Sequence, residues 1–298
     1  MKKAFLQLHL SVFLAGFTGV FGKLINLSEG VLVWYRLLIT VVSMYLLYRW
    51  KGSLPRIPRK EVMPVALTGC IVMLHWLFFY GSIKYANVSI GVVCFSLTSL
   101  FTALFDPIIN RKAFDKIELL LSLLTLSGIL LIFHFDTQYR TGIILGIISA
   151  MFAALFTVYN KRWVARFDTK AITFYELGAG FAGLTILMPL YLWLFPGVKL
   201  TPSIQDTTFL IILAWCCTIL MYQLSMEALK KISPFTVNLC FNLEPLYSIL
   251  LAFILFNEGK YLHKGFYAGL ALIALSVILQ MLRVARQSRK DSLAGVAN

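Results

Sequence analysis

Long apolar runs, interrupted by short clusters of charged and turn-forming residues, occupy almost the whole chain. Each run is about twenty residues long, the length that an α-helix needs to cross the hydrocarbon core of a bilayer. The pattern predicts ten transmembrane helices, over residues 4–22, 30–48, 62–83, 86–109, 117–135, 141–159, 171–194, 207–228, 234–256 and 265–282. The third and fourth helices, and the eighth and ninth, are expected to form tight hairpins, because only a few residues separate them.

The composition agrees with this pattern. Of the 298 residues, 59% are hydrophobic and 13% are charged, whereas a soluble domain has about 45–50% apolar and about 25% charged residues. A single core cannot absorb so much apolar surface. The composition therefore excludes a soluble enzyme, a disordered chain and a secreted disulfide scaffold. It predicts an all-α polytopic membrane protein whose first apolar run, too long for a signal peptide, is an uncleaved span.

The basic residues predict the orientation in the membrane. Lys and Arg number 27 against 13 acidic residues, a net charge of +14. With a cytoplasmic N-terminus, 20 of the 27 fall in cytoplasmic loops, six fall in the opposite loops, and Arg36 alone lies within a span. This bias follows the positive-inside rule, so both termini are expected in the cytoplasm. We expect the membrane to be the plasma membrane, or the inner membrane if the protein is bacterial, and no nucleic-acid partner is needed to explain the charge.

An internal sequence similarity, which we call the echo, divides the chain into two halves. The segment Cys94–Phe101 resembles Cys240–Tyr247 at an offset of 146 residues, and Trp34–Arg36 resembles Phe174–Glu176 at an offset of 140. Because each half holds five predicted helices, an odd number, the second half must enter the membrane from the opposite side. Inverted repeats are typical of secondary transporters that bind their solute near the midplane.

The second half carries a motif that identifies a resemblance. Leu243–Tyr247 with Pro245, then Asn257-Glu258, then Gly269 with Leu272-Ile273 resemble the Pro…Gly-Glu…Gly-x-x-Leu-Ile pattern of EamA domains. The chain is thus similar to the ten-helix, two-EamA-domain type of the drug/metabolite transporter superfamily. The first half departs from the pattern, with Ser99 in place of proline and Arg111-Lys112 in place of Gly-Glu.

The resemblance implies an efflux transporter of amino acids, metabolites or amphipathic compounds. The expected divisions are a first EamA repeat over residues 1–135, a second over 141–282 and a basic cytoplasmic tail over 283–298. A small solute and the lipid bilayer are the expected partners, with protons as the candidate driving ion. The protein is expected to be a monomer or a weak homodimer.

Polar side chains at bilayer depth are candidate functional residues, because they are costly to bury. Glu244 lies near the middle of the ninth predicted helix, where an ionised carboxylate costs at least about 2.5–3.5 kcal/mol. It is the candidate for proton coupling or for anchoring a solute amine. The alternative is a protonated acid, hydrogen-bonded to a neighbouring helix, that holds a kink at Pro245.

The same helix carries a second polar face. Asn238 and Asn242 share one face at i, i+4, and Glu244 lies about 200° from Asn242 around a regular helix. Either the asparagines line the solute cavity and Glu244 contacts a neighbouring helix, or the roles are exchanged. We expect the asparagines to line the cavity, and the sequence leaves the choice open.

Further candidates for solute binding lie in three other helices. Arg36 could bind a solute carboxylate through its planar fork, although it and Glu176 are expected to snorkel or to pair structurally near the membrane interface. His75, Trp76 and Tyr80 form a polar and aromatic group in the third helix, and His75 could relay protons or remain a neutral, hydrogen-bonded imidazole. Tyr222 and Gln223 occupy the eighth helix.

Motifs for catalysis, metals and phosphate-binding loops are missing from the sequence, so no enzyme activity, metal or cofactor is expected. The cysteines Cys70, Cys94, Cys216, Cys217 and Cys240 are expected to be buried thiols, and the two Gly-x-x-x-Gly motifs to pack helices within the chain. Two other functions stay open. One is a passive solute channel or uniporter, and the other is an intramembrane enzyme that uses His75 and Glu244.

Overall fold

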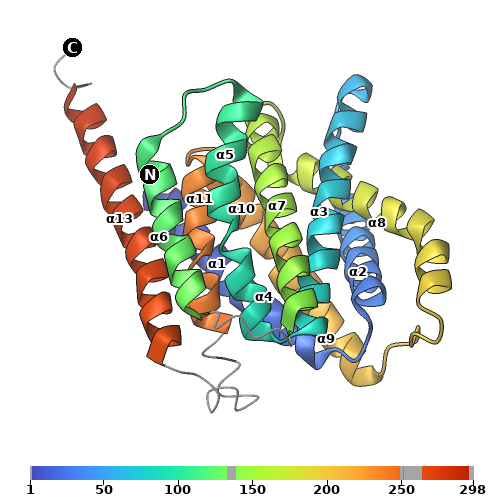
Figure 1. Cartoon of the computed structure of the whole chain (residues 1–298). Coiled ribbons are helices and arrows are strands. Elements are labelled where there is room, and N and C mark those ends of the chain that lie inside the picture. Colours follow the sequence, from blue (N-terminus) through green and yellow to red (C-terminus); the bar gives the residue numbers. More distant parts are fainter. Residues whose placement is uncertain (1, 133–138, 249–250, 252–263, 295–298) are drawn as a thin grey trace.

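The computed structural model describes residues 2–132, 139–248, 251 and 264–294, and every regular element within them is helical. Figure 1 shows these helices as one bundle. Their bounds, in chain order, are α1 Lys2–Leu24, α2 Glu29–Trp50, α3 Arg59–Tyr85, α4 Val88–Phe95, α5 Thr98–Asn110, α6 Lys116–Ile132, α7 Arg140–Val164, α8 Thr169–Leu194, α9 Ile204–Ala214, the π-helix η2 Trp215–Leu220, α10 Met221–Leu229, α11 Pro234–Phe241 and α13 Lys264–Ala294.

Eight helical segments of the described chain are long and apolar enough to cross a membrane, and each overlaps one predicted span. They are 2–24, 29–50, 59–85, 88–110, 140–164, 169–194, 204–229 and 267–287. The other two predicted spans, 117–135 and 234–256, correspond to α6 and to the segment that begins with α11. Both run into residues outside the described ranges, as does the Asn257-Glu258 motif, so the count of ten stays a prediction.

Alternate loops meet at opposite ends of the bundle. At the end that is uppermost in Figure 1, Arg166 after α7 binds Glu61 at the start of α3, with an N–O distance of 2.6 Å. At the other end, Lys84 at the end of α3 donates to the carbonyl of Ile25, and the backbone of Asn26 donates to Asp206. The end with Arg166 gathers the loops that carry most of the basic residues, and we call it the basic end.

The fourth helix of each half is broken at repeat-related positions. Ser96 interrupts the helical run between α4 and α5, and Asn242 ends α11, so the two breaks have the same 146-residue offset as the sequence echo. At each break, two successive N–H groups donate to the carbonyls three residues earlier. The first such bond runs from Ser96 to Val93 in one half and from Asn242 to Leu239 in the other. Such i→i−3 bonds tighten the last turn of a helix. The predicted echo therefore corresponds to a shared local structure.

The span over 204–229 contains a π-helical turn that the hydrophobic pattern did not predict. The N–H of Met221 donates to the carbonyl of Cys216, five residues earlier, and the Thr218 hydroxyl donates to the Leu213 carbonyl at 2.8 Å. The carbonyl of Cys217, which Met221 would use in a regular α-helix, is thereby available to another donor. π-Turns of this kind occur frequently at functional sites.

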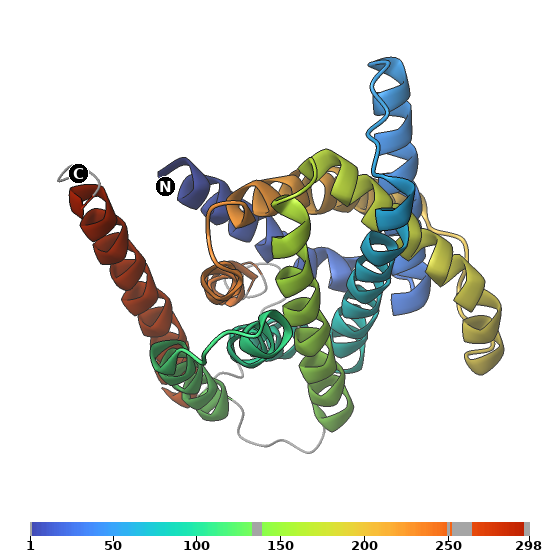
Figure 2. The same cartoon turned by 90° about the horizontal axis from the view of Figure 1, so that it is seen from above.

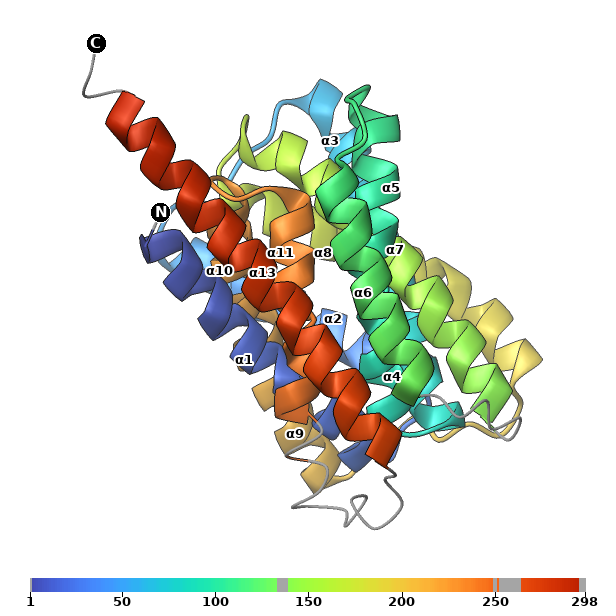
Figure 3. The same cartoon turned by 60° about the vertical axis from the view of Figure 1, so that its left-hand side comes forward.

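Glycines allow the helices of the two halves to approach closely. A Cβ at Gly146 of α7 would lie 2.5 Å from the Cβ of Cys94, and one at Gly128 of α6 would lie 2.6 Å from the carbonyl of Gly269 in α13. The glycine motifs thus pack helices within the chain, as predicted. The α6–α13 pair runs along one side of the molecule (Figure 3) and α8 lies on the opposite side, as the view from above shows (Figure 2).

One prediction about the cysteines is wrong. Cys94, Cys217 and Cys240 are buried and Cys70 is partly buried, but Cys216 is exposed. The widened π-turn carries Cys216 and Cys217 on adjacent positions, and adjacent helical residues point in different directions, so only Cys217 faces the core.

Candidate functional site

A cavity lies between the two halves, at mid-depth in the bundle. Its empty volume, including the open mouth, is about 660 Å³. Helices α1 to α4 contribute one part of its wall, and α7, α10, α11 and the segment after α11 contribute the other. The lining residues are Ala15, Thr18, Arg36, His75, Trp76, Phe79, Phe95, Ala153, Phe156, Thr157, Met221, Tyr222, Ser225, Met226, Asn238, Phe241 and Glu244.

Of the nine residues that the sequence nominated, six line this cavity and three do not. Those in the wall are Arg36, His75, Trp76, Tyr222, Asn238 and Glu244. Of the other three, Tyr80 binds the wall residue Arg36. Gln223 and Asn242 bind Thr173 and Ser99, which do not line the cavity. Much of the remaining wall is made of phenylalanine and methionine side chains. The sequence could not single these out, because phenylalanine or methionine occurs in each of the ten predicted spans.

Arg36 is buried in the protein and does not snorkel. Its side chain has no exposed surface. The guanidinium donates to the Thr218 hydroxyl at 2.7 Å, to the Tyr80 hydroxyl at 2.8 Å and to the Cys217 carbonyl at 2.9 Å. Its central carbon lies 3.8 Å from the ring centroid of Trp76, a cation–π contact. The π-turn therefore has a specific consequence, since it provides the carbonyl that fixes Arg36.

Glu244 lines the same cavity but has a different environment. Its side chain is 4% exposed, and among the described residues no hydrogen bond or ion pair reaches its carboxyl group, Arg36 included. Arg36 and Glu244 thus face one cavity, the first held by three hydrogen bonds and the second by none. A buried carboxyl without a hydrogen-bond partner favours its neutral form, or the binding of a cation or a hydrogen-bond donor.

His75 is fixed to α7 across the boundary between the halves. Its Nδ1 lies 2.8 Å from the Ser149 hydroxyl and 3.1 Å from the Ser149 carbonyl, and the same hydroxyl donates to the His75 carbonyl at 3.0 Å. The rings of Phe95, Phe156 and Phe79 surround the imidazole at centroid distances of 5.3, 5.7 and 6.0 Å. The imidazole therefore has one satisfied polar edge in an otherwise aromatic wall.

The two asparagines share a face, as predicted, but this face packs on α5. Asn238 donates to the Thr102 hydroxyl at 2.7 Å, and Asn242 donates to the Ser99 hydroxyl at 3.1 Å. Asn238 also borders the cavity, whereas Asn242 does not. The expectation that both asparagines line the cavity, with Glu244 turned away, is therefore not met. The angle of about 200° assumed a regular helix, but α11 ends at Phe241 and the turn at Asn242 changes the direction of Glu244.

Behind the wall, a second acid forms a hydrogen-bonded cluster. Glu176 of α8 has no exposed surface, so it does not snorkel either. Its Oε2 accepts from the Tyr222 hydroxyl at 2.5 Å and from the Asn160 amide at 3.4 Å. Gln223, next to Tyr222, donates to the Thr173 hydroxyl at 2.8 Å. Both Tyr222 and Gln223 thus bind α10 to α8, and only Tyr222 also reaches the cavity.

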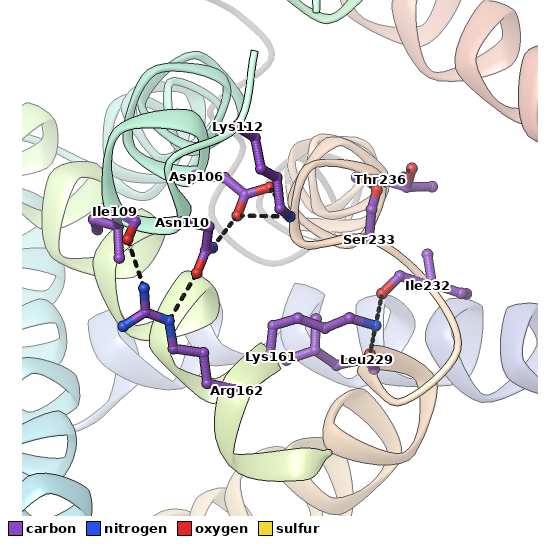
Figure 4. Close-up of polar contacts among 10 residues, drawn as sticks. All are labelled: Asp106, Ile109, Asn110, Lys112, Lys161, Arg162, Leu229, Ile232, Ser233 and Thr236. Carbon is purple, nitrogen blue, oxygen red and sulfur yellow. Dashed lines mark hydrogen bonds and ion pairs between the residues drawn. The ribbon is translucent and has the colours of Figure 1, made fainter. Parts of the chain in front are cut away.

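The basic end of the bundle is held together by lysine and arginine contacts with backbone carbonyls (Figure 4). Lys161 of α7 donates to the carbonyls of Leu229 at 2.6 Å and Ile232 at 2.9 Å, so it binds the turn between α10 and α11. Arg162 donates to the Asn110 side chain at 2.7 Å and the Ile109 carbonyl at 2.6 Å at the end of α5. At this end, these contacts connect the wall helix α7 both to α5 and to the turn between the wall helices α10 and α11.

The match to a known family follows this arrangement. Residues 2–134 and 140–281 each match the EamA-like transporter family. The chain belongs to this family. Two successive matches within one chain give the two-repeat architecture that the echo predicted. The family is a transporter family, which agrees with the expectation that this protein is not an enzyme.

Relatives agree with the family assignment. A protein of Haemophilus influenzae named an uncharacterized transporter is 28% identical over 75% of this chain and 74% of its own length. A second one from Archaeoglobus fulgidus, with the same name, is 23% identical over 76% of this chain and 79% of its own. A solved crystal structure covers 92% of this chain and 96% of its own at a TM-score of 0.69 and 17% identity, which shows a shared fold.

Proposed function

We propose that this EamA-family protein is a secondary transporter that exports a small organic solute by alternating access around the mid-depth cavity. The observation that carries the proposal is the place of Glu244, a carboxyl group that has no hydrogen-bond partner in the described part of the chain and that faces a cavity bordered by both halves. The two halves would rock about this cavity and expose it to each side of the membrane in turn.

Proton coupling through Glu244 supports transport against a gradient. A carboxyl group that alternately binds a proton and a solute group links the two movements, because it cannot hold both. One proton that moves down a pH difference of one unit releases about 1.4 kcal/mol, enough for a tenfold solute gradient. The solute would contact His75, Trp76, Tyr222 and Asn238 in the wall, with Arg36 as the fixed positive group beside them.

The location follows the charge bias. The basic end contains the loops with most of the lysine and arginine residues, so we place it, with both termini, in the cytoplasm of a plasma or bacterial inner membrane. We keep the predicted division into repeats over 1–135 and 141–282. An alternative is a passive channel or uniporter, and the test below separates it from a coupled transporter.

The test uses purified protein in liposomes, an imposed pH gradient, and a panel of radiolabelled amino acids, amines and other metabolites. Wild-type protein should accumulate at least one solute when the gradient is present. Glu244→Gln should abolish the accumulation and leave folding intact. Glu227→Gln is the matched control, because Glu227 is partly exposed at the basic end, bound to Thr169 and Lys230, and should transport normally.

Three results would contradict parts of the proposal. Full pH-driven accumulation by Glu244→Gln would remove the coupling role of Glu244. Movement that only equilibrates each solute, without acceleration by unlabelled solute on the opposite side, would favour the passive channel over a transporter. Chemical change of a solute in detergent, where no compartments exist, would favour the intramembrane enzyme.

A further inference from the structure

The cluster of Glu176, Tyr222 and Asn160 contains two buried acceptor atoms that lack a donor. Glu176 Oε1 and Asn160 Oδ1 are both inaccessible and have no hydrogen-bond partner. The Asn160 amide already donates to Glu176 Oε2 at 3.4 Å and to the Tyr222 oxygen at 3.3 Å. Two orphaned acceptors in one cluster are costly. A neutral carboxylic acid and a primary amide can pair through two hydrogen bonds, N–H to one carboxyl oxygen and O–H to the amide oxygen, and Asn160 and Glu176 already form the first of these.

Within the residues that the structure describes, no positive charge compensates Glu176. Two side chains bind its carboxyl group, Tyr222 from α10 and Asn160 from α7. The third neighbour, Gly69 of α3, contacts the Glu176 backbone. Lys161, the next residue after Asn160, is bound instead to carbonyls at the basic end. Among the described residues, therefore, no salt bridge involves Glu176. An ionised, uncompensated carboxylate with no exposed surface is far more costly than a neutral acid.

The first half contains a repeat-related pair, Arg36 and Tyr80, in which an arginine takes the place of the acid. Arg36 and Glu176 lie 140 residues apart, and their tyrosine partners Tyr80 and Tyr222 lie 142 apart. Arg36 donates to the Tyr80 oxygen, whereas Tyr222 donates to Glu176. In both halves, the polar residue of the second helix thus fixes a tyrosine hydroxyl of the third. Only in the second half does the tyrosine line the cavity.

We propose that Glu176 is a neutral carboxylic acid that positions the cavity residue Tyr222. The acid hydrogen resides on Oε1 and supplies the donor that Asn160 Oδ1 lacks, while Oε2 accepts from the Tyr222 hydroxyl. Glu176 is a positioning residue, since it reaches the solute only through Tyr222. The inference rests on the proposed function for its role in solute recognition. The protonation state and the hydrogen bonds can be tested without any transported solute.

Infrared spectroscopy tests the protonation state. Wild-type protein in lipid films at pH 7 should show the C=O stretching band of a protonated carboxyl group, which Glu176→Gln removes. Glu244→Gln is measured in parallel, because Glu244 can contribute a band of its own, and the Glu176 band must persist in that variant. Absence of any band that depends on Glu176 at pH 7 would overturn the proposal, since it would mean that Glu176 is ionised.

Stability and rescue test the hydrogen bonds. A glutamine is the isostere of the neutral acid, and its NH₂ group can donate where the acid hydrogen does. Glu176→Gln should therefore keep the wild-type apparent Tm in detergent. Glu176→Ala should lower it by roughly 2–10 °C, because it leaves the Tyr222 hydroxyl and Asn160 without partners. A glutamine variant as unstable as the alanine variant would contradict the proposal.

The positioning role is tested with whichever amino acid or amine the liposome panel shows to be transported. Glu176→Ala and Tyr222→Phe should raise the KM for this solute to a similar extent, and Glu176→Gln should leave it unchanged. Loss of pH-driven transport in Glu176→Gln, with a normal Tm, would instead make Glu176 a proton carrier. If no panel solute is transported, the infrared and Tm results still decide the protonation state, so the two proposals fail separately.

Discussion

Among the glycines that the structure describes, Gly69 leaves the least space for a Cβ, and its replacement gives a direct test of the packing between α3 and α8. A Cβ at this position would lie 2.0 Å from the carbonyl oxygen of Glu176 and 2.7 Å from its Cα, whereas ordinary contact begins at 3.4 Å. The atoms it meets are backbone, so no side-chain rotation can relieve the overlap. Gly69→Ala must therefore move α3 and α8 apart by about 1 Å, and we expect it to destabilise the protein.

The magnitude follows from two opposing effects. Overpacking of a tight interior contact costs about 1–3 kcal/mol. Replacement of glycine by alanine inside a helix contributes about 0.5–1 kcal/mol in the stabilising direction. Because the overlap at Gly69 is with backbone atoms, its cost lies in the upper part of this range, about 2–3 kcal/mol, and the net loss for Gly69→Ala is about 1–2.5 kcal/mol. A Cβ added at Gly178, on α8 itself, would meet no atom of a neighbouring helix within 4 Å, so Gly178→Ala should keep the helix gain alone.

The assay is thermal unfolding of the purified variants in one detergent, followed by intrinsic fluorescence. We expect an apparent Tm that is lower by roughly 2–8 °C for Gly69→Ala and equal or higher for Gly178→Ala. The comparison cancels the general effect of adding a methyl group to a membrane helix. Equal stability of the two variants would refute the close approach of α3 and α8 at Gly69.

Two further predictions concern the basic end. Partial burial would raise the pKa of Asp115, but hydrogen bonds from Arg283 and from backbone N–H groups outweigh it and hold the pKa below its ordinary value. The stabilisation of the folded state by ionised Asp115 is under about 1 kcal/mol, because the pair with Arg283 is partly exposed. It is present at neutral pH and is lost as the pH falls through the lowered pKa. Asp115→Asn should therefore flatten the acid limb of a curve of Tm against pH, and an unchanged limb would contradict the prediction. Lys161→Met should speed backbone hydrogen exchange at residues 229–233, because this turn loses the bonds from the Lys161 ammonium to its carbonyls. Lys170 is an exposed lysine at the same end, so exchange in this turn should be normal in the control Lys170→Met. Equal exchange in both variants would argue against the contact.

The sequence predicted the spans well because a span is a local property. The apolar run over 171–194 and the helix Thr169–Leu194 differ by only two residues, since about twenty apolar residues define both. The π-turn at Trp215–Leu220 was not predicted, because its sequence contains neither proline nor glycine. The breaks at Ser96 and Asn242 were equally hidden, although the repeat echo marked the two segments as related.

The candidate site was predicted less well because it depends on contacts between distant segments. Arg36 looked like a snorkelling residue near the end of a span, and only the structure brings the Cys217 carbonyl of another helix within 2.9 Å of it. The helical-wheel argument placed Asn242 in the cavity because it assumed an unbroken helix. Residue type alone nevertheless nominated six cavity residues, since polar groups at bilayer depth are rare and costly.

The three ionisable groups Arg36, Glu176 and Glu244 differ in how the protein satisfies them. Arg36 has three hydrogen bonds and a tryptophan ring, and Glu176 has two hydrogen bonds behind the wall. The protein itself supplies these partners, so neither group depends on a solute for the hydrogen bonds that hold it. Glu244 has no hydrogen-bond partner among the described residues and faces the cavity. Its free energy therefore depends on what occupies the cavity, which is the property that a coupling residue requires, and this difference supports Glu244 over Glu176 as the site where proton and solute compete.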